Sequence, residues 1–440
     1  MLLTHLGSHI LIAGSHAMTD YSLLNIATFV VIVAIFSQLA QDKLKLPASI
    51  SALSVGLLLK MLSVGGVIQT DYLFDQMTLI LLPILLTLDI LHLRWEYVKK
   101  HGLSLFGAAG VSVLLAIAAG VGVSEWMLPG YELPIAAVVM LMCMVTATDP
   151  CSVSAIFATQ DVPKDLKILA EGESCGNDAT VLVVFSLALF VETNPTEATL
   201  TAMSIKGLLV VFGALGIGAI VGIAGVWLMK MTRNMIIETL ILLGSAYLSF
   251  AITEHFHFSG ILAIITSAML VNTVILKRIE EDNRIIREGG EATRAIVDKA
   301  NHESMQTFIQ FLGVIAVTIM FLSLGDIVDF SAIAHYWKEI LSVFLASTLI
   351  RAFVMFLFGL VSNQVRKMQN IPFSWYKVMV FGGVKGCLSL IMLHLIPDSK
   401  EYKETFEAIV IGVILLTTFV YPLFLVGTLK WYGERVHHTK

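Results

Sequence analysis

Thirteen apolar runs follow one another along the chain, most of them long enough to cross a lipid bilayer. A helix needs about 20 consecutive apolar residues to span the hydrocarbon core. Charged residues make up only 14% of the 440 residues, against about 25% in an average soluble domain. The sequence therefore predicts an all-α integral membrane protein of about thirteen transmembrane helices. The runs fall at 22–40, 47–65, 74–93, 102–127, 133–159, 167–192, 202–229, 235–252, 258–276, 303–326, 333–362, 374–396 and 404–429.

The loop charges predict how the chain threads the membrane, because lysine and arginine gather in cytoplasmic loops. With the N-terminus outside, 20 lysines and arginines fall in the cytoplasmic segments. Three lysines, Lys338, Lys400 and Lys403, then fall outside. This asymmetry favours thirteen spans in a cell inner or plasma membrane, with the N-terminus outside and the C-terminus in the cytoplasm.

The odd number of spans also predicts two similar halves within one membrane unit, residues 1–440. Residues 22–192 and 235–429 would form six-helix repeats that enter the membrane from opposite sides, with the linking helix 202–229 between them. In inverted repeats of this kind, the substrate site lies near the midplane between interrupted helices.

Three segments lie outside the predicted spans. Residues 1–20 are interpreted as an apolar leader to the first span, with Met18 as an alternative start. Residues 277–302 are predicted to form a cytoplasmic loop. Their mixed charges fit either a solvated connector or a regulatory amphipathic helix. Residues 430–440 predict a short cytoplasmic tail.

Five ionisable residues fall deep inside apolar runs, where a charge costs on the order of 3 kcal/mol and usually marks a function. At a rise of 1.5 Å per residue, all except Glu173 lie roughly 15–17 Å from the cytoplasmic ends of their spans. We therefore expect four charges from four helices to meet near the bilayer centre. The five are Asp149, Glu173, Asp178, Arg351 and Lys385.

Two of these spans carry residues that interrupt helices. In Thr148-Asp149-Pro150, the proline removes a backbone donor and pushes the preceding residue out of the α region. In 382–386, Gly-Gly-Val-Lys-Gly, three glycines favour an unwound stretch. Asp149 could then balance the positive end of one half-helix, and Lys385 the negative end of another. A plain proline kink and glycine-mediated helix packing are the alternatives.

The run from 167 to 192 carries oxygen ligands along one face. Asp178 lies one turn after Ser174 and two turns after Glu171. Carboxylate and hydroxyl oxygens are the ligands that hard cations prefer, and Thr148 could add a carbonyl or hydroxyl oxygen. Asn177 faces away from Asp178, toward the broken span. A structural ion pair between Glu173 and Arg351 would leave the role of Asp178 unexplained.

This ordered set of motifs resembles the cation–proton antiporter family that contains the NhaP-type bacterial sodium/proton antiporters and the animal sodium/proton exchangers. The resemblance covers nearly the whole membrane domain. It is carried by Thr148-Asp149-Pro150, the EGESxxND pattern of 171–178, Arg351, the GGVKG of 382–386, and the segment 256–263.

The resemblance implies an NhaA/NhaP-like antiporter fold with crossed broken helices, a homodimer, and a six-helix core that rocks against a dimerisation domain. We expect no cofactor. The net charge of −5 argues against a nucleic-acid partner, and the sequence carries no HExxH, GxSxG or comparable nucleophile–base set that would indicate an enzyme. The substrates would be H⁺ and a monovalent cation, Na⁺, Li⁺ or K⁺. The implied ion-binding residues are Asp178, Ser174 and Thr148, while Asn177 braces the site, Glu173 and Arg351 form an ion pair, and Asp149 and Lys385 balance helix ends.

Three departures from the family pattern touch the ion pocket. Cys175-Gly176 stands where bulky apolar residues are usual, and Lys385 replaces the usual arginine. The family often has a glutamate in the third span, where this chain has Leu88 followed by Asp89. These differences bear on cation selectivity more than on the reaction.

We therefore predict that Na⁺ is exchanged for H⁺ through competition at Asp178, whose charged form desolvation disfavours. A single competing carboxylate beside Asn177 predicts one-for-one, electroneutral exchange. The alternatives are K⁺/H⁺ antiport, a cation channel, and a carrier in which Arg351 and Lys385 bind an organic anion. Cys151, Cys175 and Cys387 could line a soft-metal site, although packing is the commoner role of such cysteines.

Overall fold

The computed structural model of the chain describes residues 20–44, 47–62, 71–92, 95–158, 160, 162–193, 200–256, 258–287 and 292–438. All but the last residue of the predicted leader, 1–20, lie outside this part. Every regular element among the described residues is a helix.

Each predicted apolar run coincides with one helix or with a set of shorter helices joined end to end. The elements are α2 (Asp20–Leu44), α3 (Ala48–Met61), α4 (Asp71–His92), α5 (Trp95–Phe106), the π-helix η1 (Gly107–Val111), α6 (Ser112–Gly122), α7 (Ser124–Met127), α8 (Ile135–Thr146), α9 (Pro150–Ala158), α10 (Lys164–Thr193), α11 (Leu200–Lys230), α12 (Met235–His255), α13 (Gly260–Arg287), α14 (Ala292–Ile327), α15 (Phe330–His335), α16 (Trp337–Gln364), α17 (Phe373–Phe381), α18 (Cys387–His394) and α19 (Lys403–His438).

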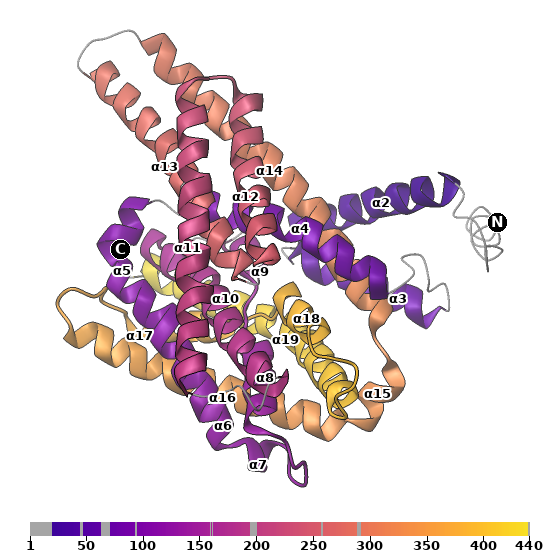
Figure 1. Cartoon of the computed structure of the whole chain (residues 1–440). Helices are drawn as coiled ribbons and strands as arrows, with labels where there is room; N and C mark the ends of the chain where they lie inside the picture. Colours follow the sequence, from indigo (N-terminus) through magenta and orange to yellow (C-terminus); the bar gives the residue numbers. More distant parts are fainter. Residues whose placement is uncertain are drawn as a thin grey trace.

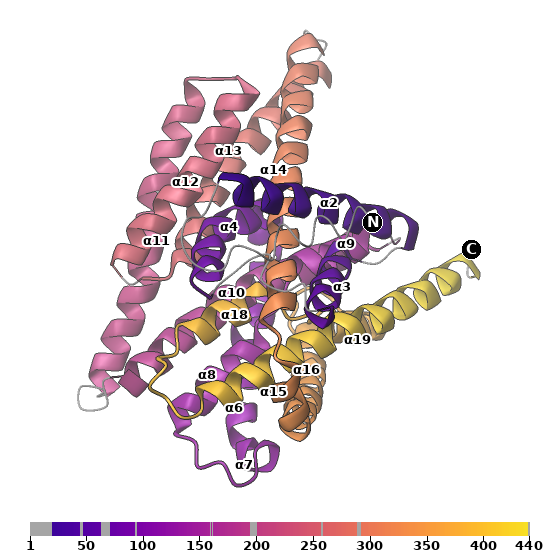
Figure 2. The same cartoon turned by 90° about the vertical axis from the view of Figure 1, so that its right-hand side faces the viewer.

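The helices group into two bundles (Figure 1). The first bundle contains α2–α4 and α11–α14, and the second contains α5–α10 and α15–α19. Contacts are dense within each bundle and sparser between them (Figure 2). Between the bundles, α10 approaches α11, α13 and α4, while α3 approaches α9 and α19, and α4 approaches α9 and α18. Each bundle therefore combines helices from both predicted halves, 22–192 and 235–429.

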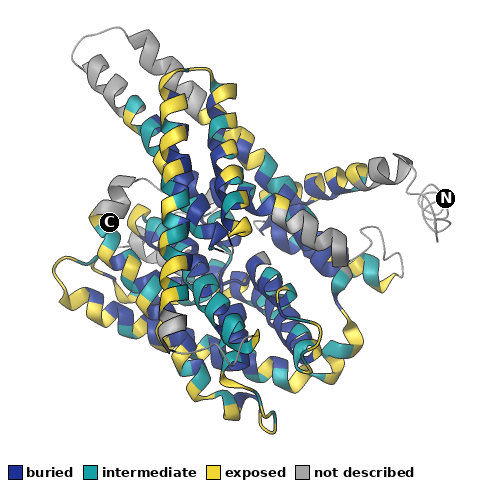
Figure 3. Ribbon diagram, viewed as in Figure 1, coloured by how far each residue is buried: buried dark blue, intermediate teal, exposed yellow. Residues whose placement is uncertain are grey.

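Eight helices of the described residues are long and apolar enough to cross a membrane, whereas α3 and α8 are apolar but shorter. Apolar side chains along α11 are exposed (Figure 3), as expected for a surface in contact with lipid. They include Ile205, Leu208, Phe212 and Ile220. The protein is therefore a multi-pass membrane protein, while the count of thirteen crossings and the direction of threading stay predictions.

The segment 277–302 differs from the expected loop. The helix α13 continues to Arg287 and α14 begins at Ala292, so no separate surface helix lies between the two spans in the described residues. Acidic and basic residues spaced four apart, such as Glu280 and Arg284, favour helix continuation into water. The predicted tail is likewise helical, because α19 extends to His438.

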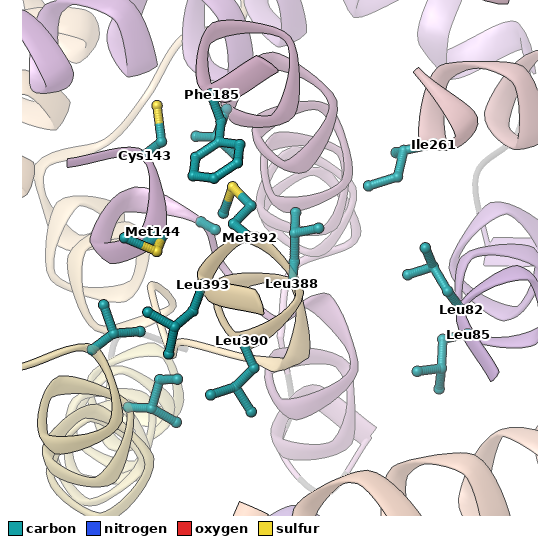
Figure 4. Close-up of a cluster of buried hydrophobic side chains, with 14 of the residues drawn as sticks. Leu82, Leu85, Cys143, Met144, Phe185, Ile261, Leu388, Leu390, Met392 and Leu393 are labelled. Carbon is teal, nitrogen blue, oxygen red and sulfur yellow. The ribbon is translucent and has the colours of Figure 1, made fainter. Parts of the chain in front are cut away.

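Two spans are broken in the middle, where the sequence carries its proline and glycines. The helix α8 ends at Thr146, and α9 begins at Pro150. Proline is well tolerated at the first position of a helix. The helix α17 ends at Phe381 and α18 begins at Cys387. Buried side chains of α8, α10 and α18, including Met144, Phe185 and Met392, pack beside these breaks (Figure 4).

Candidate ion-binding site

The two broken spans cross at their extended segments. The backbone N–H of Asp149 donates to the carbonyl oxygen of Val384 at 2.7 Å. A Cβ added at Gly386 would lie 2.6 Å from the Cβ of Asp149, which is too close for any side chain. Glycine at this position therefore allows the two chains to touch.

The buried, positively charged side chains of Lys385 and Arg351 lie at the C-terminal ends of two half-helices, where the carbonyl groups give a partial negative charge. The Nζ of Lys385 donates to the carbonyl oxygen of Thr146 at the end of α8, at 3.3 Å. The Nε and Nη2 of Arg351 donate to the carbonyl oxygen of Met379 near the end of α17, at 3.2 and 3.0 Å. Both carbonyl groups, near the ends of their half-helices, thus accept from charged side-chain donors.

Asp149 lies at the opposite, positive end of a half-helix. Its Oδ2 accepts from the backbone N–H of Ser152 at 3.2 Å and also from the Ser152 hydroxyl. This is the geometry of a helix N-cap, in which a side-chain oxygen satisfies a backbone donor of the first turn. The same carboxylate lies beside Gly386, the N-cap of α18.

Arg351 and Glu173 form a buried, two-pronged ion pair. The Nη1 and Nη2 of Arg351 donate to Oε1 and Oε2 of Glu173 at 3.2 and 2.9 Å. The two residues are only 8% and 2% exposed. A Cβ at Gly383 would lie 2.5 Å from Nε of Arg351, so the glycine leaves room for the guanidinium group.

Three oxygen-bearing side chains gather where α10 passes the break in the α8–α9 span. The Oδ1 of Asp178 accepts from the backbone N–H of Thr148 at 3.3 Å. The hydroxyl oxygens of Thr148 and Ser174 lie 2.7 Å apart. The Nδ2 of Asn177 donates to the Thr148 hydroxyl and to the Thr146 carbonyl, both at 3.0 Å. The structure therefore brings together the residues that the sequence singled out as ion ligands.

The side chains of this cluster are almost fully buried. Asp178 is 5% exposed, Ser174 1%, Thr148 2% and Asn177 0%. A charged carboxylate is costly in such surroundings unless a cation or proton neutralises it. The arrangement can thus hold a small dehydrated cation or a proton, and it needs a movement of the helices to reach water.

A separate cavity lies on the other side of α8. It is lined by residues of α6, α8 and α16, among them Thr146 and Arg351, and by Lys385. Asp178 does not line this cavity. The side chains of Arg351 and Lys385 therefore face one cavity, which Asp178 and Ser174 of α10 do not line.

Other residues singled out in the sequence are not among the contacts that the structure describes for this cluster. Leu88 packs against Gly313 of α14, and the side chain of Asp89 lies outside the described residues. Cys175 and Cys143 are buried, whereas the side chains of Cys151 and Cys387 are not described. The described residues contain no group of three histidine, cysteine, aspartate or glutamate side chains that could hold a metal ion.

Sequence reasoning missed three serines that support the crossing. Ser152, in the first turn of α9, donates its backbone N–H and its hydroxyl to the carboxylate of Asp149, and its Oγ lies 3.0 Å from Oγ of Ser49 in the first bundle. The hydroxyl of Ser389 donates to the carbonyl oxygen of Met144 at 2.7 Å. The spacing of three residues between Asp149 and Ser152 was the one available signal.

Comparisons with known proteins give a consistent result. A family model described as "Sodium/hydrogen exchanger, transmembrane" matches residues 27–431. The chain is 28% identical over 391 residues to the Na⁺/H⁺ antiporter ApNhaP of Aphanothece halophytica, covering 89% of this chain and 70% of that protein. It is 24% identical over 431 residues to the Na⁺/H⁺ antiporter NhaH of Halobacillus dabanensis, covering 96% and 99%.

The fold is also similar to a solved structure, that of the sodium proton antiporter MjNhaP1 from Methanocaldococcus jannaschii at pH 8. The two superpose with a TM-score of 0.71 over 94% of this chain and 98% of that one. At 18% sequence identity, this likeness supports the helical arrangement alone.

Proposed function

This chain belongs to the sodium/hydrogen exchanger family, and we propose that it exchanges Na⁺ for H⁺ by competition at the carboxylate of Asp178. Na⁺/H⁺ exchange is the activity named for relatives that cover most of the chain. The observation that carries the assignment to Asp178 is the burial of its carboxylate beside the Thr148 and Ser174 hydroxyls.

The cation would bind through oxygen atoms of Asp178, Ser174 and Thr148. The three residues come from two elements that meet only because the α8–α9 span is broken. Sodium is a hard cation that favours carboxylate and hydroxyl oxygens, and a carboxylate that holds a proton has lost its charge for the cation. Binding of one substrate therefore excludes the other.

The surrounding polar and charged residues would hold the geometry of the site without binding either substrate. Asn177 fixes the Thr148 segment, and the Glu173–Arg351 pair ties α10 to α16. Asp149 and Lys385 balance the half-helix ends. Because Asn177 stands beside Asp178 where a second acid would carry another proton, we propose electroneutral exchange of one Na⁺ for one H⁺.

Access would alternate by movement of the second bundle against the first. Asp178 is buried, so one static arrangement cannot serve both sides of a membrane. The sparse contacts between the bundles make their boundary the surface where movement costs least. We also propose a homodimer in a cell inner membrane, with the N-terminus outside and the C-terminus in the cytoplasm.

An assay in proteoliposomes tests this function. With a pH dye trapped inside, an inward Na⁺ gradient should make the lumen alkaline, and Li⁺ or K⁺ in place of Na⁺ reports selectivity. An added K⁺/valinomycin clamp should leave the rate unchanged if exchange is electroneutral. A rate that follows the membrane potential would contradict electroneutrality, and ion flux without proton counterflow would favour a channel. A response to organic acids alone would favour the anion carrier.

A further inference from the structure

Glu171 is a buried carboxylate that the exchange at Asp178 does not use. It is 5% exposed and lies on the same face of α10 as Ser174 and Asp178. Along the helix axis it lies about 10 Å from Asp178, toward the N-terminal end of α10. The loop charges predict that this end faces the cytoplasm.

The contacts of Glu171 join the helix surface to the broken span. The hydroxyl of Ser154, on α9, donates to Oε1 of Glu171 at 2.7 Å. The Nζ of Lys167 lies 3.8 Å from the same oxygen, and its side chain is 38% exposed. Glu171 thus lies between the exposed ammonium group of Lys167 and the interior that leads to Asp178.

The neighbourhood of Glu171 opposes the entry of a cation unless a carboxylate is present. Lys164 and Lys167 lie at the start of α10, and a helix N-terminus carries partial positive charge. Asp165 supplies an exposed carboxylate in the first turn, and Glu171 supplies the buried carboxylate further along the helix, toward Asp178. From there, Ser174 and Asp178 continue the row of oxygen ligands at intervals of about one helical turn.

We propose that Glu171 is an intermediate binding site for the transported cation between the cytoplasm and Asp178. A Na⁺ ion that arrives from the cytoplasm replaces the ammonium group of Lys167 at the Glu171 carboxylate. It then moves along the face of α10, past the Ser174 hydroxyl, to Asp178. This inference rests on the proposed Na⁺/H⁺ exchange.

Half-saturation by Na⁺, measured separately at each membrane face in vesicles of known orientation, tests the inference. In Glu171→Gln, half-saturation at the cytoplasmic face should need several-fold more Na⁺, while half-saturation at the outer face and the rate at saturating Na⁺ stay near wild type. Lys167→Gln should shift the cytoplasmic value in the opposite direction, because the competing cation is gone.

Glu192→Gln is the matched control. Glu192 lies on the same helix beyond Asp178, and its Oε1 is 2.7 Å from Nζ of Lys400. The same substitution there also breaks an ion pair, yet it should leave the cytoplasmic half-saturation unchanged.

A purely structural tie between α9 and α10 would give a different result. Glu171→Gln would then change both faces equally or neither, and Lys167→Gln would not improve cytoplasmic binding; either finding overturns the inference. If Glu171→Gln fails to reach the membrane, Lys167→Gln decides alone. Failure of Na⁺/H⁺ exchange itself is recognised separately, because wild type would then show no Na⁺-driven proton movement at any concentration.

Discussion

Asp178→Asn is expected to reduce Na⁺-driven proton movement in proteoliposomes to the level of protein-free vesicles. The substitution keeps the size of the side chain and an oxygen that can accept from the N–H of Thr148. It removes the negative charge that binds Na⁺ and the group that carries the proton. The fold should therefore persist while both substrates lose their common site.

The control for this variant is Asp398→Asn. Asp398 lies in the loop between α18 and α19, where its side chain is 95% exposed and contacts Lys403. Its loss should leave exchange near wild type. Thermal unfolding in detergent should show both variants folded. Exchange by Asp178→Asn at the wild-type rate would show that another group binds the ions.

Arg351→Met is expected to cause the largest loss of stability. Removing the guanidinium group leaves Glu173 charged and 2% exposed, and it leaves the Met379 carbonyl without the two donors of Arg351. Breaking one side of a buried ion pair costs about 3–5 kcal/mol. The melting temperature in detergent should therefore fall sharply.

Two further variants separate the ion pair from general effects. Arg366→Met makes the same change in an exposed position after α16 and should leave the melting temperature unchanged. The double variant Glu173→Met with Arg351→Met should be more stable than Arg351→Met alone, because no charge is then left unpaired. If Arg351→Met has the same melting temperature as Arg366→Met, the Glu173–Arg351 ion pair does not stabilise the fold.

The positions of the helices and of their breaks could be predicted from the sequence because their causes are local. Apolar length sets a span, and Pro150 and the glycines of 382–386 interrupt helices wherever they stand. The pairing of Glu173 with Arg351 could be suggested from their charges, because charged residues inside membrane spans usually pair with one another.

The grouping of helices into two bundles could not be predicted in this way. It depends on which apolar faces pack, and apolar residues facing lipid and facing protein look alike in sequence. For the same reason, the contacts of Lys385 with Thr146 and of Ser389 with Met144 became visible only once the two broken spans were placed across one another.

The ends of α13 and α14 also could not be predicted from the sequence. Hydropathy marks where a helix leaves the apolar region, but it does not mark where the helix ends. Lysine, arginine and glutamate are good helix formers, and they supply most of the charges at the end of α13, which continues as far as Arg287. Hydropathy alone therefore predicted a loop where both helices continue.

Proton release on Na⁺ binding tests the competition at Asp178 most directly. Purified protein in weakly buffered detergent solution, at a pH where the site is protonated, should release about one proton per bound Na⁺ when NaCl is added. Choline chloride should release none, and Asp178→Asn should respond to neither salt. Sodium that binds to the wild-type protein without releasing a proton would contradict the competition between the two ions.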